Sequence, residues 1–207
     1  MNSKITLLLI LALLSVSTSP IIGRALVGVN AVSISFWMMF IAAIVLWSFS
    51  LIKPQGKMKV SININRTICA GILLGIHFAL FFEAIKITKI ANATFLGTLA
   101  PFFTLIIELY ILKRYYSSKI LLGLFLTLIG SIIILGYQFN IESQYTIGNL
   151  YAVLCSICIA IALMIGEKVR QKEDTIVYTR LLYLSASFTL FMICLLYTSP
   201  SPRDFTE

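Results

Sequence analysis

A stripe of polar side chains runs along one apolar segment of this sequence. Its members recur at spacings of four, three, three and four positions, which places them on one face of a helix. The stripe consists of Thr94, Thr98, Pro101, Thr104 and Glu108. Because Pro101 lacks an N–H, a helix here would leave the carbonyl of Gly97 without its usual donor. A freed carbonyl beside hydroxyls could hold a polar substrate; the alternative is a packing kink whose backbone the threonine hydroxyls satisfy.

Three of the ionisable groups within apolar segments are candidates for a functional role, because such groups are costly there and often functional. His77, the only histidine, could carry a coupled proton or could form a packing hydrogen bond, with Phe81 one turn away. Glu83 is a second candidate, and the alternative is an interfacial ion pair with Lys86, three residues on. Glu108 lies near the end of its segment, so we expect it to extend to the membrane interface rather than to act as a central ligand.

A second proline-containing segment lies near the N-terminus. Small hydroxyl residues, including Ser19, precede Pro20, which would release the carbonyl of Val16. This break could contribute to a substrate path, or it could serve helix packing alone. Trp37 is expected near the outer interface, where it could belong to an aromatic belt or line an outer vestibule. Gly71 and Gly75 form a GxxxG pattern, which predicts close packing of their segment against another helix.

Several kinds of catalytic and metal site have no sequence signature here. The chain contains no GxxxxGK[ST] phosphate loop, no HExxH and no GxSxG pattern. Cys155 and Cys158 form a CxxC, but within an apolar segment it lacks the context of a zinc or redox site and indicates packing. We therefore expect no metal, no cofactor and no ATP-driven pump. A polytopic membrane enzyme using His77 and Glu83 remains an alternative, as does an accessory subunit that does not transport.

The segments that carry these residues are long enough to cross a lipid bilayer. Of the 207 residues, 59% are hydrophobic and only 12% are charged, and the mean hydropathy is +0.99. A membrane-spanning helix needs about 20 apolar residues, and lipid requires each segment to satisfy its own backbone groups. The sequence thus predicts an all-α integral membrane protein with seven helices: Ile5–Val27, Ser33–Ile52, Thr67–Ile85, Ile90–Leu112, Ile120–Tyr137, Ile147–Ile165 and Ile176–Ile193.

The basic residues lie mainly on one side of this predicted topology. If there are seven crossings, eleven lysines and arginines fall on the side of Lys4, and three fall on the other side: Arg24, Lys86 and Lys89. Because positive residues stay in the cytoplasm, we expect a cytoplasmic N-terminus in a prokaryotic cytoplasmic membrane. The net charge of +8 is then explained by topology and the lipid bilayer, not by nucleic acid. Residues 1–20 resemble a signal peptide, but the apolar run continues beyond them, which favours a retained helix.

The end of the chain differs in character from the rest. Residues 194–204 resemble the translated read-through of a transposase-type sequencing adapter over eleven contiguous residues. We therefore expect residues 194–207 to be a non-native tail, Ile193 to be the last native residue, and the natural protein to continue. The alternative is a native tail rich in proline and serine.

Sliding the sequence along itself by about 142–143 residues reveals a weak internal repeat, in which Gly23 falls near Gly166. Further motifs have a characteristic order: Phe81–Thr94, Leu99–Phe103, Gly130–Gly136 and Gly148–Ala152. In this order and spacing, the chain from Lys4 to Ile193 resembles the EamA-type drug/metabolite transporter superfamily. It departs from that pattern at Arg114, where the family often has an acidic residue, and at Met38, in the region where it often has an arginine.

The resemblance implies ten helices in two inverted five-helix repeats in the intact protein, of which about seven are here. The first repeat would occupy residues 1–137, an external connector 138–147, and the start of the second repeat 148–193. The implied function is secondary transport of a small polar metabolite, such as an amino acid, by alternating access. The candidate pathway residues are Ser19, Pro20, Trp37, His77, Phe81, Glu83, Thr94, Thr98 and Pro101. The expected partners are a small-molecule substrate and the lipid bilayer, with a homodimer as a further candidate.

Overall fold

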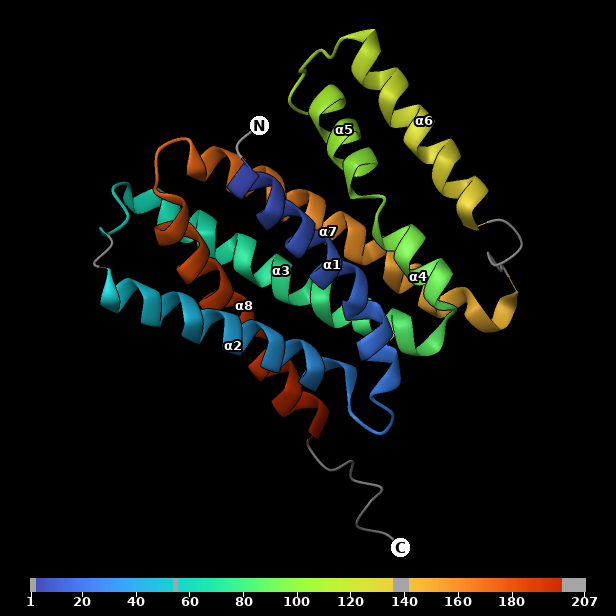
Figure 1. Ribbon diagram of the computed structural model, residues 1–207, viewed down its shortest axis with the longest axis horizontal. Coiled ribbons are helices and arrows are strands. Elements are labelled where there is room, and N and C mark those ends of the chain that lie inside the picture. The colour runs from blue at the N-terminus through green and yellow to red at the C-terminus, as the bar shows by residue number, and fades with distance from the viewer. Residues whose placement is uncertain (1–2, 54–55, 136–141, 199–207) are drawn as a thin grey trace, which may run out of the picture.

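All the regular elements that the structure describes are helices (Figure 1). The structure is a computed structural model, and it describes residues 3–53, 56–135 and 142–198. The α-helices are α1 (Ser3–Ala25), α2 (Ala31–Ile52), α3 (Ser61–Ile87), α4 (Ile90–Gly97), α5 (Ala100–Tyr110), α6 (Ser118–Leu135), α7 (Thr146–Arg170) and α8 (Thr175–Thr198). A short 3₁₀ turn, η2 (Ser143–Tyr145), precedes α7.

The helices have the length and composition of membrane spans. Within the described residues there are six such spans, with α4 and α5 together forming one, and α6 is a shorter apolar helix. Large apolar side chains, such as Leu13, Val16 and Leu122, are exposed on the outer faces of the helices, where lipid would cover them. The predicted all-α multipass membrane protein is confirmed at this level.

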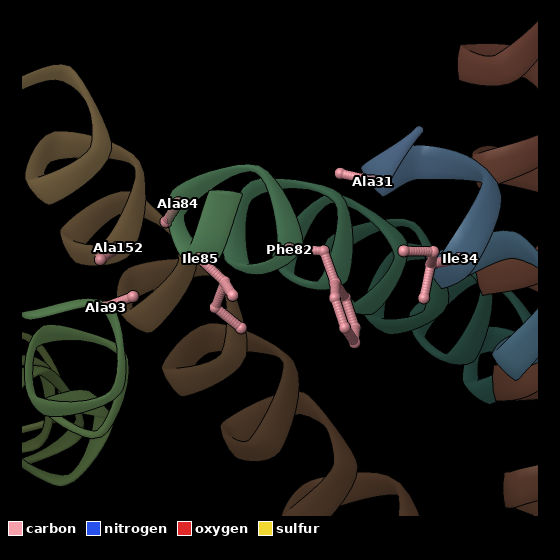
Figure 2. Packing of buried hydrophobic residues seen from close by; sticks show 7 residues of the cluster. All are labelled: Ala31, Ile34, Phe82, Ala84, Ile85, Ala93 and Ala152. Atoms are coloured by element: carbon pink, nitrogen blue, oxygen red, sulfur yellow. The ribbon is translucent and has the colours of Figure 1, made fainter. Parts of the chain in front are cut away.

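The helix α3 lies at the centre of the bundle, between α7 and α8, and α2 packs against α8 (Figure 1). Small residues allow this close approach. At one end, the apolar cluster shown in Figure 2 joins α2, α3, α4 and α7 through Ala31, Ile34, Phe82, Ala84, Ile85, Ala93 and Ala152. Four of these seven are alanines, so the backbones meet with little side chain between them.

The predicted GxxxG surface of α3 faces α8. A Cβ atom added at Gly71 would lie 2.5 Å from the Cβ atom of Ser185 and 2.7 Å from the carbonyl oxygen of Leu182. At Gly75 it would lie 2.9 Å from the carbonyl oxygen of Ala186. Only residues without a side chain allow α8 to pass this closely, so the packing expected of this pattern is present.

Three helices are markedly longer than predicted, and one of them, α7, continues to Arg170 where an end at Ile165 was expected. The third helix was predicted to begin at Thr67, but α3 begins at Ser61. The prediction missed the first turns of α3 because they are polar and do not belong to an apolar run. The last helix, α8, continues past Ile193 to Thr198, so five residues of the expected tail are helical. The remainder of that tail and residues 138–141 of the expected external connector lie outside the described residues.

Candidate functional site

The fourth predicted span is interrupted at its middle. The helix α4 ends at Gly97, α5 begins at Ala100, and Thr98 and Leu99 lie between them. Pro101 occupies the first turn of α5, where its missing N–H removes no bond within that helix. The carbonyl of Gly97 would be its partner in a continuous helix, and no described residue donates a hydrogen bond to that carbonyl.

The break packs closely against α3 and α7. A Cβ atom added at Gly97 would lie 3.0 Å from the ring of Phe81, which stacks on His77 with the ring planes 8° apart. The ring nitrogen Nδ1 of His77 is 2.8 Å from the carbonyl oxygen of Cys155 in α7. Ser156 of α7 donates a short hydrogen bond to the carbonyl of Leu96. The break is therefore held by side chains from two neighbouring helices.

The threonines of the polar stripe donate to their own backbone. The hydroxyl of Thr94 donates to Ile90, that of Thr98 to Phe95, and that of Thr104 to Ala100. Each hydroxyl oxygen can still accept a hydrogen bond. Thr98 and Pro101 are exposed, and Thr94 is half-buried. Pro101, Thr104 and Glu108 of the stripe line a cavity.

This cavity, of about 480 Å³, lies between α5, α6 and α7. Apolar side chains form most of its wall, including Leu105, Leu124 and Leu163. The polar residues that line it are Thr104, Glu108, Tyr116, Thr127 and Glu167. It therefore combines an apolar wall with two carboxylates.

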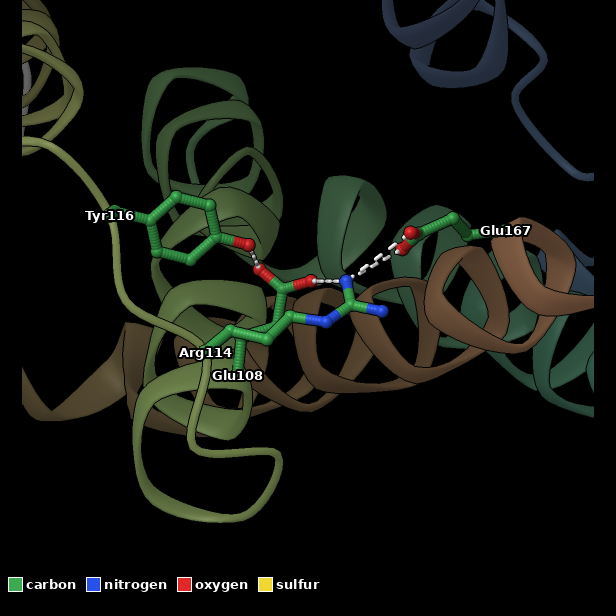
Figure 3. Close-up of polar contacts among 4 residues, drawn as sticks. All are labelled: Glu108, Arg114, Tyr116 and Glu167. Atoms are coloured by element: carbon green, nitrogen blue, oxygen red, sulfur yellow. Dashed lines mark hydrogen bonds and ion pairs between the residues drawn. The ribbon is translucent and has the colours of Figure 1, made fainter.

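Glu108 is buried in a cluster of charged and hydrogen-bonded side chains (Figure 3). The Nη1 atom of Arg114 lies 2.9 Å from Oε1 of Glu108 and 3.2 Å from Oε1 of Glu167 on α7. The hydroxyl of Tyr116 donates a short hydrogen bond to the other oxygen of Glu108. Glu108 does not extend away from the bundle, because the chain folds back after α5 and brings Arg114 and Tyr116 onto it.

The turn between α5 and α6 shapes this cluster. Lys113 adopts a left-handed backbone conformation, with φ of 51°, and the backbone N–H of Arg114 donates to the carbonyl of Glu108. In this turn, the hydrogen bond to Glu108 raises the pKa of Tyr116, so the phenol remains a donor at neutral pH. Hydrogen bonding and the charge of Glu167 likewise raise the pKa of Arg114.

A second cavity, of about 440 Å³, lies between α1, α2 and α3. Ser19 and Trp37 line it together with Phe82, and the Trp37 side chain is 56% exposed. Pro20 is buried within α1, which continues past it to Ala25 without an interruption. The structure thus brings Ser19 and Trp37 to one cavity, and places Pro101 in another.

His77 and Glu83 do not come together as a catalytic pair. His77 bonds to the backbone of Cys155 and makes ring contacts with Phe78 and Phe81, and no hydrogen bond joins it to Glu83 in the described part of the chain. The expected alternative for Glu83, an ion pair with Lys86, is also not formed there, because Lys86 donates to the carbonyls of Leu26 and Val29.

Comparisons with known proteins agree with this architecture. Residues 3–136 match the EamA-like transporter family. The chain belongs to that family. A crystal structure of another protein, 18% identical, superposes on 91% of this chain with a TM-score of 0.66, which shows a shared fold. This chain spans 63% of the length of that protein. Among curated proteins, none matches the chain significantly.

Sequence reasoning missed several contacts that join the helices of this EamA-like protein. Arg24, at the end of α1, donates to the carbonyls of Ile85 and Thr88 at the end of α3. Thr88 and the fully buried Asn92 both donate to the side-chain oxygen of Asn149 on α7, at 2.9 Å each. The sequence placed Arg24 on the outer side of the membrane. It gave no hint that this side chain caps the end of another helix.

At the opposite end, Glu173 joins the α7–α8 turn to the start of α3. Its carboxylate accepts hydrogen bonds from the backbone N–H groups of Lys59 and Val60, at 2.8 and 2.9 Å, and from the side chain of Asn63. These hydrogen bonds, led by the one from Lys59, hold the pKa of Glu173 below its usual value. One feature of the sequence could have indicated this contact, namely the polar stretch before Thr67.

Arg180 of α8 makes a further connection at this end. Its guanidinium donates to the hydroxyl of Ser50 and to the carbonyl of Gly56, at 3.2 and 2.8 Å, and lies 5.0 Å from the ring centroid of Trp47. Arg180 therefore holds α8 against α2. No group of three or more potential metal ligands occurs among the described residues.

Proposed function

We propose that this EamA-like chain belongs to a secondary transporter of a small polar metabolite, such as an amino acid or a related compound, which works by alternating access. The family consists of membrane transporters of the drug/metabolite type. No cofactor is required for such transport, because an ion or substrate gradient drives it. The chain would contribute the first five-helix repeat and the start of an inverted second repeat.

The observation that carries this proposal is the interrupted fourth span. Discontinuous helices in transporters place backbone groups where a substrate can bind and allow one part to move against another. Here the interruption at Thr98 and Leu99 separates α4, which lies in the bundle, from α5, which leads to α6 at its margin (Figure 1). The carbonyl of Gly97 and the exposed Thr98 would contribute to the substrate path.

The proposed repeat is supported by matched details in the α1–α2 and α7–α8 pairs. The side chain of Asn30 accepts from the backbone N–H two residues on, at the start of α2. Asp174 makes the same capping bond at the start of α8. A second unit that begins after five spans would run inverted in the membrane.

The path would be lined by candidate residues from two regions. Ser19 and Trp37 line the cavity between α1, α2 and α3, and Pro20 lies next to it. His77, Phe81, Thr94, Thr98 and Pro101 surround the break. Glu83 would lie at the outer end of α3. We further propose a cytoplasmic membrane of a prokaryote, a cytoplasmic N-terminus and a homodimer as the candidate assembly; no nucleic acid takes part.

The direct test is counterflow in proteoliposomes. Vesicles that contain the purified protein are loaded with one unlabelled amino acid at a time and diluted into the same labelled compound. A transporter accumulates label above its equilibrium level, and protein-free vesicles do not. A Thr98→Val variant, which removes one exposed hydroxyl at the break, should reduce the initial rate. Absence of counterflow over the whole amino acid panel would contradict the proposed substrate class.

A further inference from the structure

We propose that the hairpin of α5 and α6 is a mobile arm, which swings away from α7 about a pivot at Thr98 and Leu99. The ion pair of Arg114 and Glu167 latches this arm to α7. The inference rests on the proposed function for the purpose of the motion. Its test measures the motion itself without any substrate, so the arm and the transport function can fail separately.

The part of the fourth span that precedes the break is anchored to the bundle. On α4, Asn92 is fully buried and donates a hydrogen bond to Asn149 of α7 at 2.9 Å, and Ala93 is also fully buried. The carbonyl of Leu96, at the edge of the break, accepts a hydrogen bond from the hydroxyl of Ser156 on α7. These contacts fix α4 to α7 up to the edge of the break.

The hairpin that follows the break is anchored much less. Of the eleven residues of α5, only Ala100 and Glu108 are buried, and none of residues 118–133 of α6 is buried. Within the part of the chain that the structure describes, Arg114 and Glu167 form the one hydrogen-bonded pair that joins this hairpin to another helix. Figure 1 shows the hairpin at the margin of the bundle. The anchoring therefore changes abruptly at the break.

The backbone at the break has the freedom that a pivot needs. Thr98 and Leu99 lie between the two helices, and Pro101 has no N–H to offer the carbonyl of Gly97. No backbone hydrogen bond joins a described residue of α4 directly to one of α5. A swing of about 20° here would move the far end of α5, about 16 Å from the pivot, by about 5 Å.

Two cavities and a weak latch allow this swing. The cavity of about 480 Å³ and a smaller one of about 190 Å³ both adjoin the contact between α5 and α7, so that contact is not tightly packed. The side chains of Arg114 and Glu167 (Figure 3) are 38% and 46% exposed, with 3.2 Å between their nitrogen and oxygen atoms. Because so exposed an ion pair adds little stability, the latch can break and re-form.

The test measures distances between spin labels by double electron–electron resonance in lipid nanodiscs. In a background from which the four cysteines have been removed, labels at Leu122→Cys and Gln171→Cys report on the arm. Labels at Asn65→Cys and Gln171→Cys report on the anchored bundle; all three positions are exposed. We expect two distances, about 5 Å apart, for the arm pair and one for the bundle pair. A single narrow distance for the arm pair would overturn the proposal.

A variant of the latch tests its role. Glu167→Gln removes the ion pair to α7 but keeps the pair of Arg114 and Glu108 within the hairpin. The ratio of the longer to the shorter arm distance should rise about two- to fivefold, as expected for the loss of an exposed ion pair. Asp174→Asn is the matched control, since it removes one negative charge but keeps the capping oxygen of α8, and it should leave the ratio unchanged. An unchanged ratio in Glu167→Gln, or equal broadening of the bundle pair, would overturn the latch.

A second variant locates the pivot. Pro101→Ala supplies an N–H that can bond to the carbonyl of Gly97 and connect α4 to α5, so the arm pair should show one distance. Thr104→Ala, on the same helix, changes no backbone N–H and should keep both distances. Thermal stability is measured for each variant, to confirm that it is folded. Two distances in folded Pro101→Ala protein would overturn the assignment of the pivot to Thr98 and Leu99.

Discussion

The effect of a proline depends on where in a helix it lies. In a helix interior it costs about 3 kcal/mol relative to alanine, but Pro101 lies in the first turn of α5, where that cost is largely absent. We therefore expect Pro101→Ala to leave membrane abundance and thermal stability close to those of the wild type. The restored N–H can bond to the carbonyl of Gly97, so uptake should fall if that carbonyl binds substrate. The experiment measures both the uptake and the membrane abundance of the variant.

The two readings of Pro101 give different results in this experiment. Loss of uptake at normal abundance supports a place for the Gly97 carbonyl on the substrate path. If uptake stays normal at normal abundance, Pro101 shapes only the packing of the break.

Glu173 provides a prediction about pH at the residue scale. Its pKa in the folded protein is lowered by hydrogen bonds from Lys59, Asn63 and Val60, so the ionised form stabilises the fold. This contribution is present above the ordinary carboxyl value of about 4.3 and is lost as the pH falls through the lowered value. We expect Glu173→Gln to lower the unfolding temperature at pH 7, and the difference from wild type to shrink between pH 5 and pH 3 in thermal scans.

The neighbouring Asp174→Asn variant is the control for this titration, because asparagine retains the capping oxygen. Its unfolding temperature should stay near that of the wild type at pH 7. A difference between Glu173→Gln and wild type that stays constant down to pH 3 would argue against the titration of Glu173.

At the scale of elements, apolar run length predicted the helices but not their polar ends or breaks. Hydropathy located the fourth span, and Pro101 indicated a kink, yet the two residues left outside the helices depend on packing against Phe81 and Ser156. The burial of Glu108 could not be predicted either. It requires the left-handed turn at Lys113 and the approach of α7, which are tertiary features.

The contact between α3 and α8 can be tested with paired glycine substitutions. The carbonyl of Leu182 cannot move away from a new Cβ atom at Gly71 without shifting α8. We expect Gly71→Ala to cost about 1–3 kcal/mol, as overpacking does. Gly130→Ala on α6 is the matched control: its added Cβ atom meets no neighbour within 4 Å, and alanine favours a helix over glycine by about 1 kcal/mol. Equal stability of the two variants in denaturant titrations would show that α8 does not pack this closely.

At the scale of the whole molecule, two of the basic connections that the sequence predicted to share a side lie together. Glu173 of the α7–α8 turn bonds to the backbone of Lys59 in the α2–α3 loop, so these two basic connections lie at one end. Arg24, counted on the other side, donates to the carbonyl of Thr88 at the opposite end of α3. Lys86 at that same end donates to the carbonyl of Leu26 after α1. The sequence could assign the charges to two ends because successive loops between spans lie on alternate sides of the membrane. It could not show that several of these cations bond to backbone carbonyls.

The orientation of these two ends in the membrane is the last prediction. Positive residues are retained in the cytoplasm, so the end that carries Lys57 should face inward and the turn that carries Gln144 should face outward. In a background from which the four cysteines of the chain have been removed, single cysteines replace the exposed residues Lys57 and Gln144. In intact cells, a membrane-impermeant maleimide should label Gln144→Cys and spare Lys57→Cys, and both should react after permeabilisation. The reverse pattern in intact cells would place the basic end outside, and with it the Glu108 cavity, which adjoins the α5–α6 turn on the basic side.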